Sequence, residues 1–272
     1  MSDSINITEK KYKKLVLQVS QSGFKYGCFD TLSDSLLFIK SVGFDNYPKT
    51  ANVTDHYWKA FVDNSELTKN YDEVIVIHEN SLNTFVPQQL FDEDLLGSYL
   101  QYNTQVFETD FFAFDELPNC AINNVYIPFV NINNFLIDQF GPFVYKSASS
   151  ILVSKLMELS KNRDDKQVYT HFYSGKFEIV VLQNQKLLLY NSFDYKTKED
   201  FLYYLLFTAE QLNLNPETFK LYMLGAISEE HEIYKFAYKY VRDIALLDVS
   251  DEMQKNNLTK AENLEHYILL QS

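Results

Sequence analysis

One order of predicted elements runs through this chain of 272 residues twice. In each half, three strands joined by short turns are followed by a helix, a strand, a second helix and a last strand. Strands are predicted where β-branched and aromatic residues lie between turn residues, and helices where apolar residues recur at helical spacing. Solenoid repeats have about 20 to 50 residues. This longer repeat therefore predicts two α/β lobes, each with the order β-β-β-α-β-α-β.

The second half of the sequence shows this order most clearly. Thr197 and Asp200 have the spacing of a capping box, which predicts the start of a helix that ends before Pro216. Ser228 predicts the start of a second helix, and the apolar end of the polar tail, 267–270, predicts a last helix that docks. The predicted strands lie at 168–173, 177–182, 186–190, 219–224 and 244–247.

The first half repeats the order but contains an insertion. Helices are predicted to begin at Thr54 and Asn131. The insertion spans about 80–122, with a predicted helix at 92–102 and a predicted strand at 106–112. The strands outside the insertion are predicted at 15–19, 24–29, 36–41, 74–77, 125–129 and 143–145.

A charged stretch marks the predicted boundary between the two lobes. Residues 161–166 follow a predicted helix at 149–160 and are almost all charged. Segments that link domains are typically polar and exposed. The first lobe is therefore predicted at 1–161, including the insertion, and the second lobe with the C-terminal tail at 162–272.

Three runs in the second half carry a resemblance to a known family. They are Phe172–Phe177 (FYSGKF), Leu187–Phe193 (LLLYNSF) and Glu199–Tyr204 (EDFLYY). Together with the doubled element order, they resemble a bacterial family of uncharacterised proteins with the actin-like ATPase fold, in which two ribonuclease-H-like lobes flank a central cleft. The resemblance implies that α/β fold, but a fold does not by itself supply a function.

Working actin-like ATPases carry an Asp, one further residue and a Gly on the first strand of each lobe. The carboxylate organises hydrated Mg²⁺ and the attacking water, and the glycine lets the hairpin approach the phosphates. The resemblance places neutral residues at both Asp positions, Gln18 in the first lobe and His171 in the second. Ser20 and Tyr173 stand at the Gly positions, and we expect the Tyr173 side chain to intrude into the phosphate channel.

The other positions of this implied nucleotide cleft are glycines. Gly23 and Gly175 lie in the two hairpin turns, and Gly225 remains where two glycines normally face adenosine, with Ala226 replacing the second. A neutral Gln or His cannot replace the charge that holds a hard cation such as Mg²⁺. We therefore predict a degenerate cleft with no catalytic residue, no metal and no cofactor. ATP bound without hydrolysis is the alternative.

Composition and motifs disfavour several other activities. The net charge is −13 and the densest basic stretch, Lys10–Lys14, is short, whereas nucleic-acid backbones are bound by clustered Lys and Arg. A two-metal nuclease needs acidic residues on the first strands, and Gln18 and His171 count against it. The five histidines form no HxxxH pair and lie far from the two cysteines, so no zinc site is predicted. The sequence contains no Walker A loop.

The N-terminal residues and the cysteines indicate a compartment. Met1–Thr8 is polar, no run of 18 apolar residues occurs, and Cys28 and Cys120 are widely separated. These features predict a cytoplasmic protein without a signal peptide, a membrane insertion or a disulfide framework.

Two functions from different classes fit these observations. The leading one is a non-catalytic scaffold or protein-interaction protein that binds a protein partner through the degenerate cleft, the insertion or surface aromatics. The alternative is a nucleotide-binding protein or weak ATPase with rearranged site residues. His171 fits either a packed histidine or a group lining a remodelled cleft. The identity of the partner and the oligomeric state are left open.

Overall fold

The contacts of the chain divide it into two compact units. The structure is a computed structural model that describes residues 10–45, 52–107 and 109–272. Unit 1 comprises Met1–Glu79 and Pro128–Lys146, and unit 2 comprises Asn80–Ile127 and Ser147–Ser272. This division differs from the boundary expected at residue 161, because the insertion and the helix after residue 147 group with the second half of the chain.

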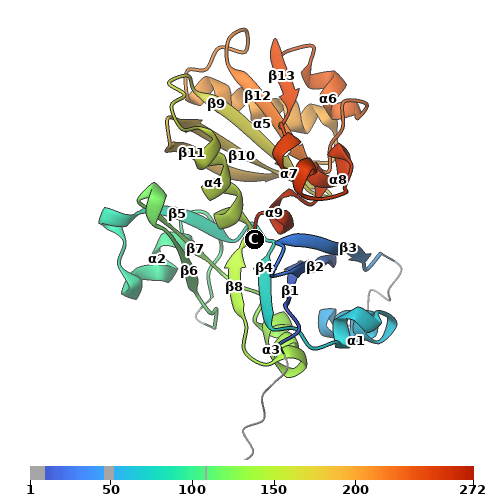
Figure 1. The fold of residues 1–272 in the computed structure, drawn as a ribbon. Coiled ribbons are helices and arrows are strands. Elements are labelled where there is room, and N and C mark those ends of the chain that lie inside the picture. The colour runs from blue at the N-terminus through green and yellow to red at the C-terminus, as the bar shows by residue number, and fades with distance from the viewer. Residues whose placement is uncertain (1–9, 46–51, 108) are drawn as a thin grey trace, which may run out of the picture. The chain divides into compact units, whose positions relative to one another are not determined.

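Unit 1 contains a five-stranded sheet with the strand order β3-β2-β1-β4-β8 (Figure 1). The central strand β1 pairs antiparallel with β2 and runs parallel to β4. The predicted meander and its return strand are therefore confirmed. The strands are β1 Lys13–Val19, β2 Gly23–Asp30, β3 Ser35–Gly43, β4 Glu73–His78 and β8 Val144–Ser147.

Two helices pack on this sheet and form the core of unit 1. Helix α1, Val53–Asp63, contributes Tyr57 and Phe61, and helix α3, Val130–Phe140, contributes Leu136 to one buried cluster with residues of the strands. The residue that caps α1 is Asn52 rather than Thr54, and α3 begins one residue before the predicted Asn131. Both helices exist as predicted, but their first residues differ.

The second half of the chain forms a sheet of the same plan in unit 2. Its strand order is β11-β10-β9-β12-β13, with β12 parallel to the central strand β9. All six residues of β9 are buried, which is typical of a strand covered on both faces. The strands are β9 Gln167–Phe172, β10 Lys176–Gln183, β11 Lys186–Asp194, β12 Lys220–Gly225 and β13 Asp243–Leu246.

The helices of unit 2 cover this sheet. Thr197 caps α5 by accepting the Asp200 backbone N–H at 3.2 Å, and Asp200 accepts the Thr197 backbone N–H at 2.9 Å, so the predicted capping box is confirmed. The second helix is capped by His231 rather than Ser228, and the helix predicted at 267–270 is present, with Tyr267, Ile268 and Leu269 buried. The helices are α4 Ala148–Leu159, α5 Lys198–Gln211, α6 Glu232–Ala237, α7 Ser250–Lys255, α8 Lys260–Glu265 and α9 Tyr267–Leu270.

The insertion folds as a three-stranded sheet with the order β5-β7-β6. The strand predicted at 106–112 is wrong over the described residues of that range. There the Asp110 side chain accepts the Phe107 N–H at 2.8 Å, a local turn contact that competes with extended pairing. The elements of the insertion are β5 Asn83–Pro87, β6 Ala113–Leu117, β7 Ile122–Tyr126 and the short helix α2 Leu96–Leu100.

Polar contacts attach the insertion to the start of α4. Asp115 on β6 accepts the Ser147 backbone N–H at 2.8 Å and the Ser150 hydroxyl at 2.5 Å. The partial positive charge at the N-terminus of α4 also stabilises a carboxylate at this position. Asn124 on β7 donates to the Ser150 hydroxyl at 2.9 Å. These contacts explain why the insertion belongs to unit 2.

The length and polarity of the helices decide whether any of them could span a membrane. Over the described parts of the chain, every helix is too short or too polar to cross a lipid bilayer.

Candidate functional site

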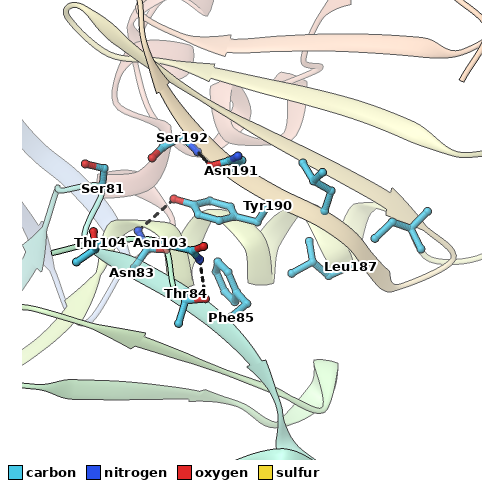
Figure 2. Close-up of a pocket in the computed structure, with 12 residues that line it drawn as sticks. Ser81, Asn83, Thr84, Phe85, Asn103, Thr104, Leu187, Tyr190, Asn191 and Ser192 are labelled. Carbon is cyan, nitrogen blue, oxygen red and sulfur yellow. Dashed lines mark hydrogen bonds between the residues drawn. The ribbon is translucent and has the colours of Figure 1, made fainter. Parts of the chain in front are cut away.

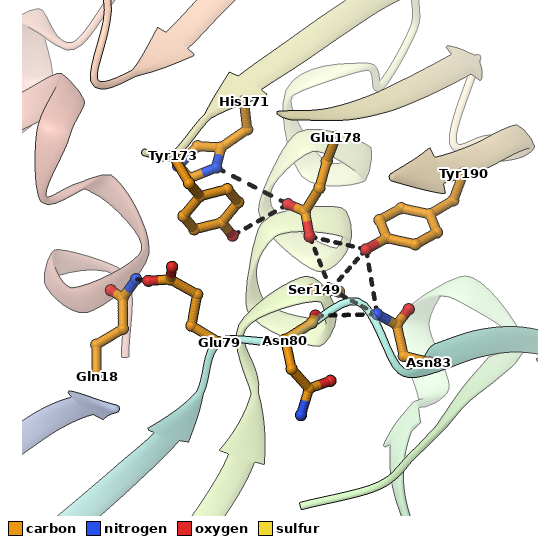
Figure 3. Close-up of polar contacts among 9 residues, drawn as sticks. All are labelled: Gln18, Glu79, Asn80, Asn83, Ser149, His171, Tyr173, Glu178 and Tyr190. Carbon is orange, nitrogen blue, oxygen red and sulfur yellow. Dashed lines mark hydrogen bonds and ion pairs between the residues drawn. The ribbon is translucent and has the colours of Figure 1, made fainter. Parts of the chain in front are cut away.

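Gln18, the first candidate residue, is the next-to-last residue of β1. Its side-chain amide donates to the Glu79 carboxylate at 2.7 Å (Figure 3). Glu79 directly follows β4, and its backbone N–H continues the pairing with β1 by donating to Val19 at 2.9 Å. The parallel strands β1 and β4 therefore bring this amide and this carboxylate together at their carboxyl ends, the place where α/β sheets commonly bind ligands.

Ser20 and Gly23 form the turn that follows Gln18. The Ser20 hydroxyl and backbone N–H both donate to the Gly23 carbonyl, at 2.8 Å and 2.9 Å. A methyl group on Gly23 would clash with the carbonyl oxygen of Val42. Tyr57 on α1 closes the turn by donating to the Ser20 carbonyl at 2.8 Å. Internal bonding and backbone packing account for both residues.

His78 lies buried beside this end of the unit 1 sheet. Its Nδ1 accepts the Phe129 backbone N–H at 3.2 Å, and its Nε2 lies 3.0 Å from the Asn133 amide oxygen. These partners suit a neutral imidazole with the proton on Nε2. Burial lowers the pKa of His78 to about 4, although its hydrogen bond with Asn133 acts in the other direction.

The low pKa of His78 predicts a dependence of stability on pH. In the unfolded chain the imidazole titrates near 6.5, so the unfolded state binds more protons and stability falls as pH drops from about 6.5 toward 4. Between pH 7 and pH 5 the expected loss from His78 is about 2 kcal/mol. Urea unfolding at both pH values measures it. The variant His78→Gln should show a pH dependence smaller by that amount, and an unchanged dependence would contradict this account.

His171 is the equivalent residue in unit 2, next to last in the central strand β9. It stands opposite Glu178 on β10 in the strand register. The His171 Nδ1 and a Glu178 carboxylate oxygen lie 3.8 Å apart, and both side chains are buried. The two units thus share a pattern in which a residue other than aspartate near the end of the central strand has a glutamate as its neighbour.

Glu178 is the centre of a buried polar network, which Figure 3 shows. One carboxylate oxygen accepts the Ser149 hydroxyl at 3.1 Å and the Tyr190 hydroxyl at 2.8 Å, and the other accepts the Tyr173 hydroxyl at 3.1 Å. Asn83 of the insertion donates to Ser149 and Tyr190 at 3.2 Å and 3.3 Å. Burial, followed by the nearby Glu178 charge, raises the pKa of Tyr190 well above its usual value. The tyrosine therefore stays a hydrogen-bond donor.

Tyr173, Gly175 and Gly225 lie around the same end of β9. The Tyr173 ring packs against the His171 ring with 4.3 Å between the two centroids. The Lys176 ammonium lies 4.5 Å from the centroid of the same Tyr173 ring. Gly175 takes a positive φ of 75° in the β9–β10 turn. Gly225 ends β12 opposite Phe172, at a φ of 89°. The Tyr173 side chain extends toward Glu178, to which its hydroxyl donates.

The seven residues singled out from the sequence therefore form two groups. Gln18, Ser20 and Gly23 lie together in unit 1. The other four surround the carboxyl end of β9 in unit 2, and they are His171, Tyr173, Gly175 and Gly225. Each group occupies the topologically equivalent end of its own sheet.

Sequence reasoning missed the two glutamates that complete these groups. Glu178 interrupts the apolar strand Phe177–Leu182, and an acid inside such a strand must find hydrogen-bond partners when it is buried. Glu79 directly follows a short apolar strand that is parallel to β1. Both signals were present in the sequence, whereas Ser149 and Asn83 carry no local signal.

The described residues offer few ligands for a metal ion. Among residues 10–45, 52–107 and 109–272, no three His, Cys, Asp or Glu side chains gather closely enough to hold one. The glutamates of the two groups each lie beside a nitrogen-bearing side chain, Glu79 beside Gln18 and Glu178 beside His171.

Comparison with known proteins identifies the fold. A family model described as "Protein of unknown function (DUF3822)" matches residues 2–244. None of the curated proteins matches the chain.

Two solved structures are similar over nearly their whole length. A crystal structure from Bacteroides thetaiotaomicron VPI-5482, of a protein with actin-like ATPase fold and unknown function, shares 22% identity, covers 99% of each chain and has a TM-score of 0.81. The PilM-PilN type IV pilus biogenesis complex contains a chain with 12% identity, coverage of 95% of this chain and 96% of that chain, and a TM-score of 0.65. At these identities the likeness shows the fold alone, and the predicted actin-like ATPase fold is confirmed.

Proposed function

This chain belongs to the DUF3822 family of proteins of unknown function, and because membership supplies no activity, we propose from the site that it is a non-catalytic protein-interaction protein on an actin-like scaffold. One observation carries the proposal. In each unit the residue near the end of the central strand is not an aspartate and has a glutamate as its neighbour, Gln18 with Glu79 and His171 with Glu178.

The residues present do not fit hydrated Mg²⁺. Mg²⁺ needs oxygen ligands in near-octahedral geometry and is usually held by one or two carboxylates. Both oxygens of Glu178 already accept hydroxyl donors, and the group is fully buried. In unit 1 the Gln18 amide directs its N–H group at Glu79. Without an aligned metal ion, phosphoryl transfer loses its main electrostatic stabilisation.

The glycine that resembles an adenosine-binding position has another explanation. A methyl group on Gly225 would clash with the Phe172 carbonyl oxygen and lie 2.7 Å from its backbone nitrogen. Packing of β12 against β9 thus requires glycine there whether or not a nucleotide binds. A partner role suits the scaffold, since the PilM-PilN type IV pilus biogenesis complex contains a chain with this fold.

One observation favours the alternative of a nucleotide-binding protein or weak ATPase. Glu79 is only partly buried, and it lies at the carboxyl end of a parallel strand pair, where α/β sheets bind ligands. In that alternative, Glu79 takes over the part of the absent aspartate and Gln18 orients it.

Phosphate release from Mg-ATP tests the proposal against this alternative. The purified full chain and the variant Glu79→Gln are incubated with millimolar Mg-ATP, and free phosphate is measured over hours. The proposal expects both proteins to release phosphate at the rate of the protein-free control. Release by the wild type that Glu79→Gln abolishes would overturn the proposal and establish the weak ATPase.

A further inference from the structure

A cavity of about 390 Å³ lies between the insertion and the second sheet of unit 2 (Figure 2). One wall is Asn83, Thr84 and Phe85 of β5, and the other is the continuous stretch 187–192 of β11. Side chains alternate between the faces of a strand, so a cavity on one face of β11 would meet every second residue. Six consecutive lining residues indicate that the cavity runs along the backbone edge of the strand.

Both walls are edges of sheets. β11 is the outermost strand of the second five-stranded sheet, and β5 is the outermost strand of the insertion sheet. An edge strand presents a row of backbone N–H and C=O groups without strand partners. The two edges contact one another through side chains, since the rings of Phe85 and Tyr190 lie 4.8 Å apart and Asn83 donates to the Tyr190 hydroxyl. These contacts hold the edges facing each other.

The lining chemistry narrows the class of ligand. In a chain of net charge −13, the cavity is lined by hydroxyl, amide, leucine and aromatic side chains, without a charged one. The edge of β11 also offers backbone N–H and C=O groups to a ligand in the cavity. The site therefore suits a neutral ligand that carries both N–H donors and C=O acceptors.

The length of the cavity favours an extended ligand over a compact cyclic one. At about 3.3 Å per strand residue, the β11 wall extends for roughly 17 Å. Six residues of an extended peptide cover this length and present backbone N–H and C=O groups along all of it. An added strand gains affinity from main-chain hydrogen bonds and specificity from pockets for alternate side chains.

We propose that the groove between β5 and β11 binds an extended, uncharged segment of a partner protein, which adds to the β11 edge as a strand. The apolar side chain of Leu188, which lines the groove and is partly exposed, then packs against the segment. This assignment deepens the proposed function by naming the surface that the partner uses, and it rests on that function.

The test uses a random library of linear heptapeptides displayed on phage and selected on the purified full chain. Kd values of enriched synthetic peptides are measured by fluorescence anisotropy for the wild type, Leu188→Lys and Leu159→Lys. The two leucines are similarly exposed, at 37% and 41%, but only Leu188 lines the groove. Leu188→Lys places a charge on the edge, a substitution that discourages strand addition. Asn191→Lys, at an exposed lining position, serves as the second variant if Leu188→Lys melts early.

The proposal expects at least a tenfold weaker Kd with Leu188→Lys and an unchanged Kd with Leu159→Lys. Methylation of alternate backbone nitrogens of the peptide should weaken binding at least tenfold, because it removes N–H donors. Failure to enrich any peptide, or undiminished binding to the groove variants, would overturn it. So would binding of the neutral sugar maltohexaose that Leu188→Lys abolishes, since the ligand is then a polyol. If any of these results occurs while phosphate release from Mg-ATP stays at the rate of the protein-free control, the groove assignment is wrong and the proposed function still holds.

Discussion

Replacing Glu178 with leucine is expected to lower the free energy of unfolding by about 3–5 kcal/mol. The wild-type carboxylate accepts hydroxyl groups from Ser149, Tyr173 and Tyr190, which come from three different parts of unit 2. Leucine has a similar size but accepts no hydrogen bond. The substitution therefore leaves three buried donors without this acceptor, and each lost bond of this kind costs about 1–3 kcal/mol.

Urea denaturation of the two proteins measures this difference. Glu116→Leu is the matched control, because Glu116 is an exposed glutamate on a strand of the same unit, and its replacement should change stability by less than about 0.5 kcal/mol. Tyr190→Phe should cost less in the Glu178→Leu background than in the wild type, since the hydroxyl has already lost its carboxylate partner. A loss below about 1 kcal/mol for Glu178→Leu would show that the network contributes little.

Replacing Gly225 with alanine is expected to destabilise the chain by about 2–5 kcal/mol. The positive φ of 89° costs an L-residue about 1–2 kcal/mol. In addition, the new methyl group would clash with the Phe172 backbone, and overpacking of this kind costs about 1–3 kcal/mol. The clash is with backbone in the centre of the sheet, so no side-chain rotation relieves it.

Gly175→Ala isolates the conformational part of this cost. Gly175 has a similar φ of 75°, but a methyl group there would meet no atom within 4 Å. We expect a loss of about 1–2 kcal/mol from backbone strain alone. Thermal or urea unfolding of both variants gives the comparison. Equal losses in the two variants would mean that the contact with Phe172 is unimportant.

Most of the second sheet could be predicted from sequence because its signals are local. The strands around Ser174-Gly175 and the capping box of Thr197 and Asp200 depend on neighbours a few residues away. Helix starts at Asn52 and His231 were displaced by a few residues, since several polar residues before each helix can act as the cap.

The polar network and the division into units could not be predicted in the same way. Ser149, Glu178 and Tyr190 are brought together by a helix and two strands, and Asn83 reaches them from the insertion, 66 residues before Ser149. These contacts also place the insertion in unit 2. The charge of residues 161–166 gives no information on these contacts, because tertiary packing determines them.

The proposed function rests on Gln18 and His171, which stand near the ends of the two central strands and have no carboxylate. Gln18 and His171 provide no anionic oxygen for Mg²⁺, and the fully buried Glu178 is engaged by its own unit. We therefore expect Mg-ATP to bind the folded state no more tightly than the unfolded state. Ligands stabilise a protein only when they bind its folded state.

Thermal unfolding of the full chain with and without Mg-ATP tests this claim most directly. A ligand at about 100 times its Kd stabilises the folded state by about 2.7 kcal/mol, which is a readily visible rise in Tm. The account predicts the same Tm in buffer, in millimolar Mg²⁺ and in millimolar Mg-ATP. A Tm that rises with Mg-ATP concentration, and does not rise with Mg²⁺ alone, would contradict it.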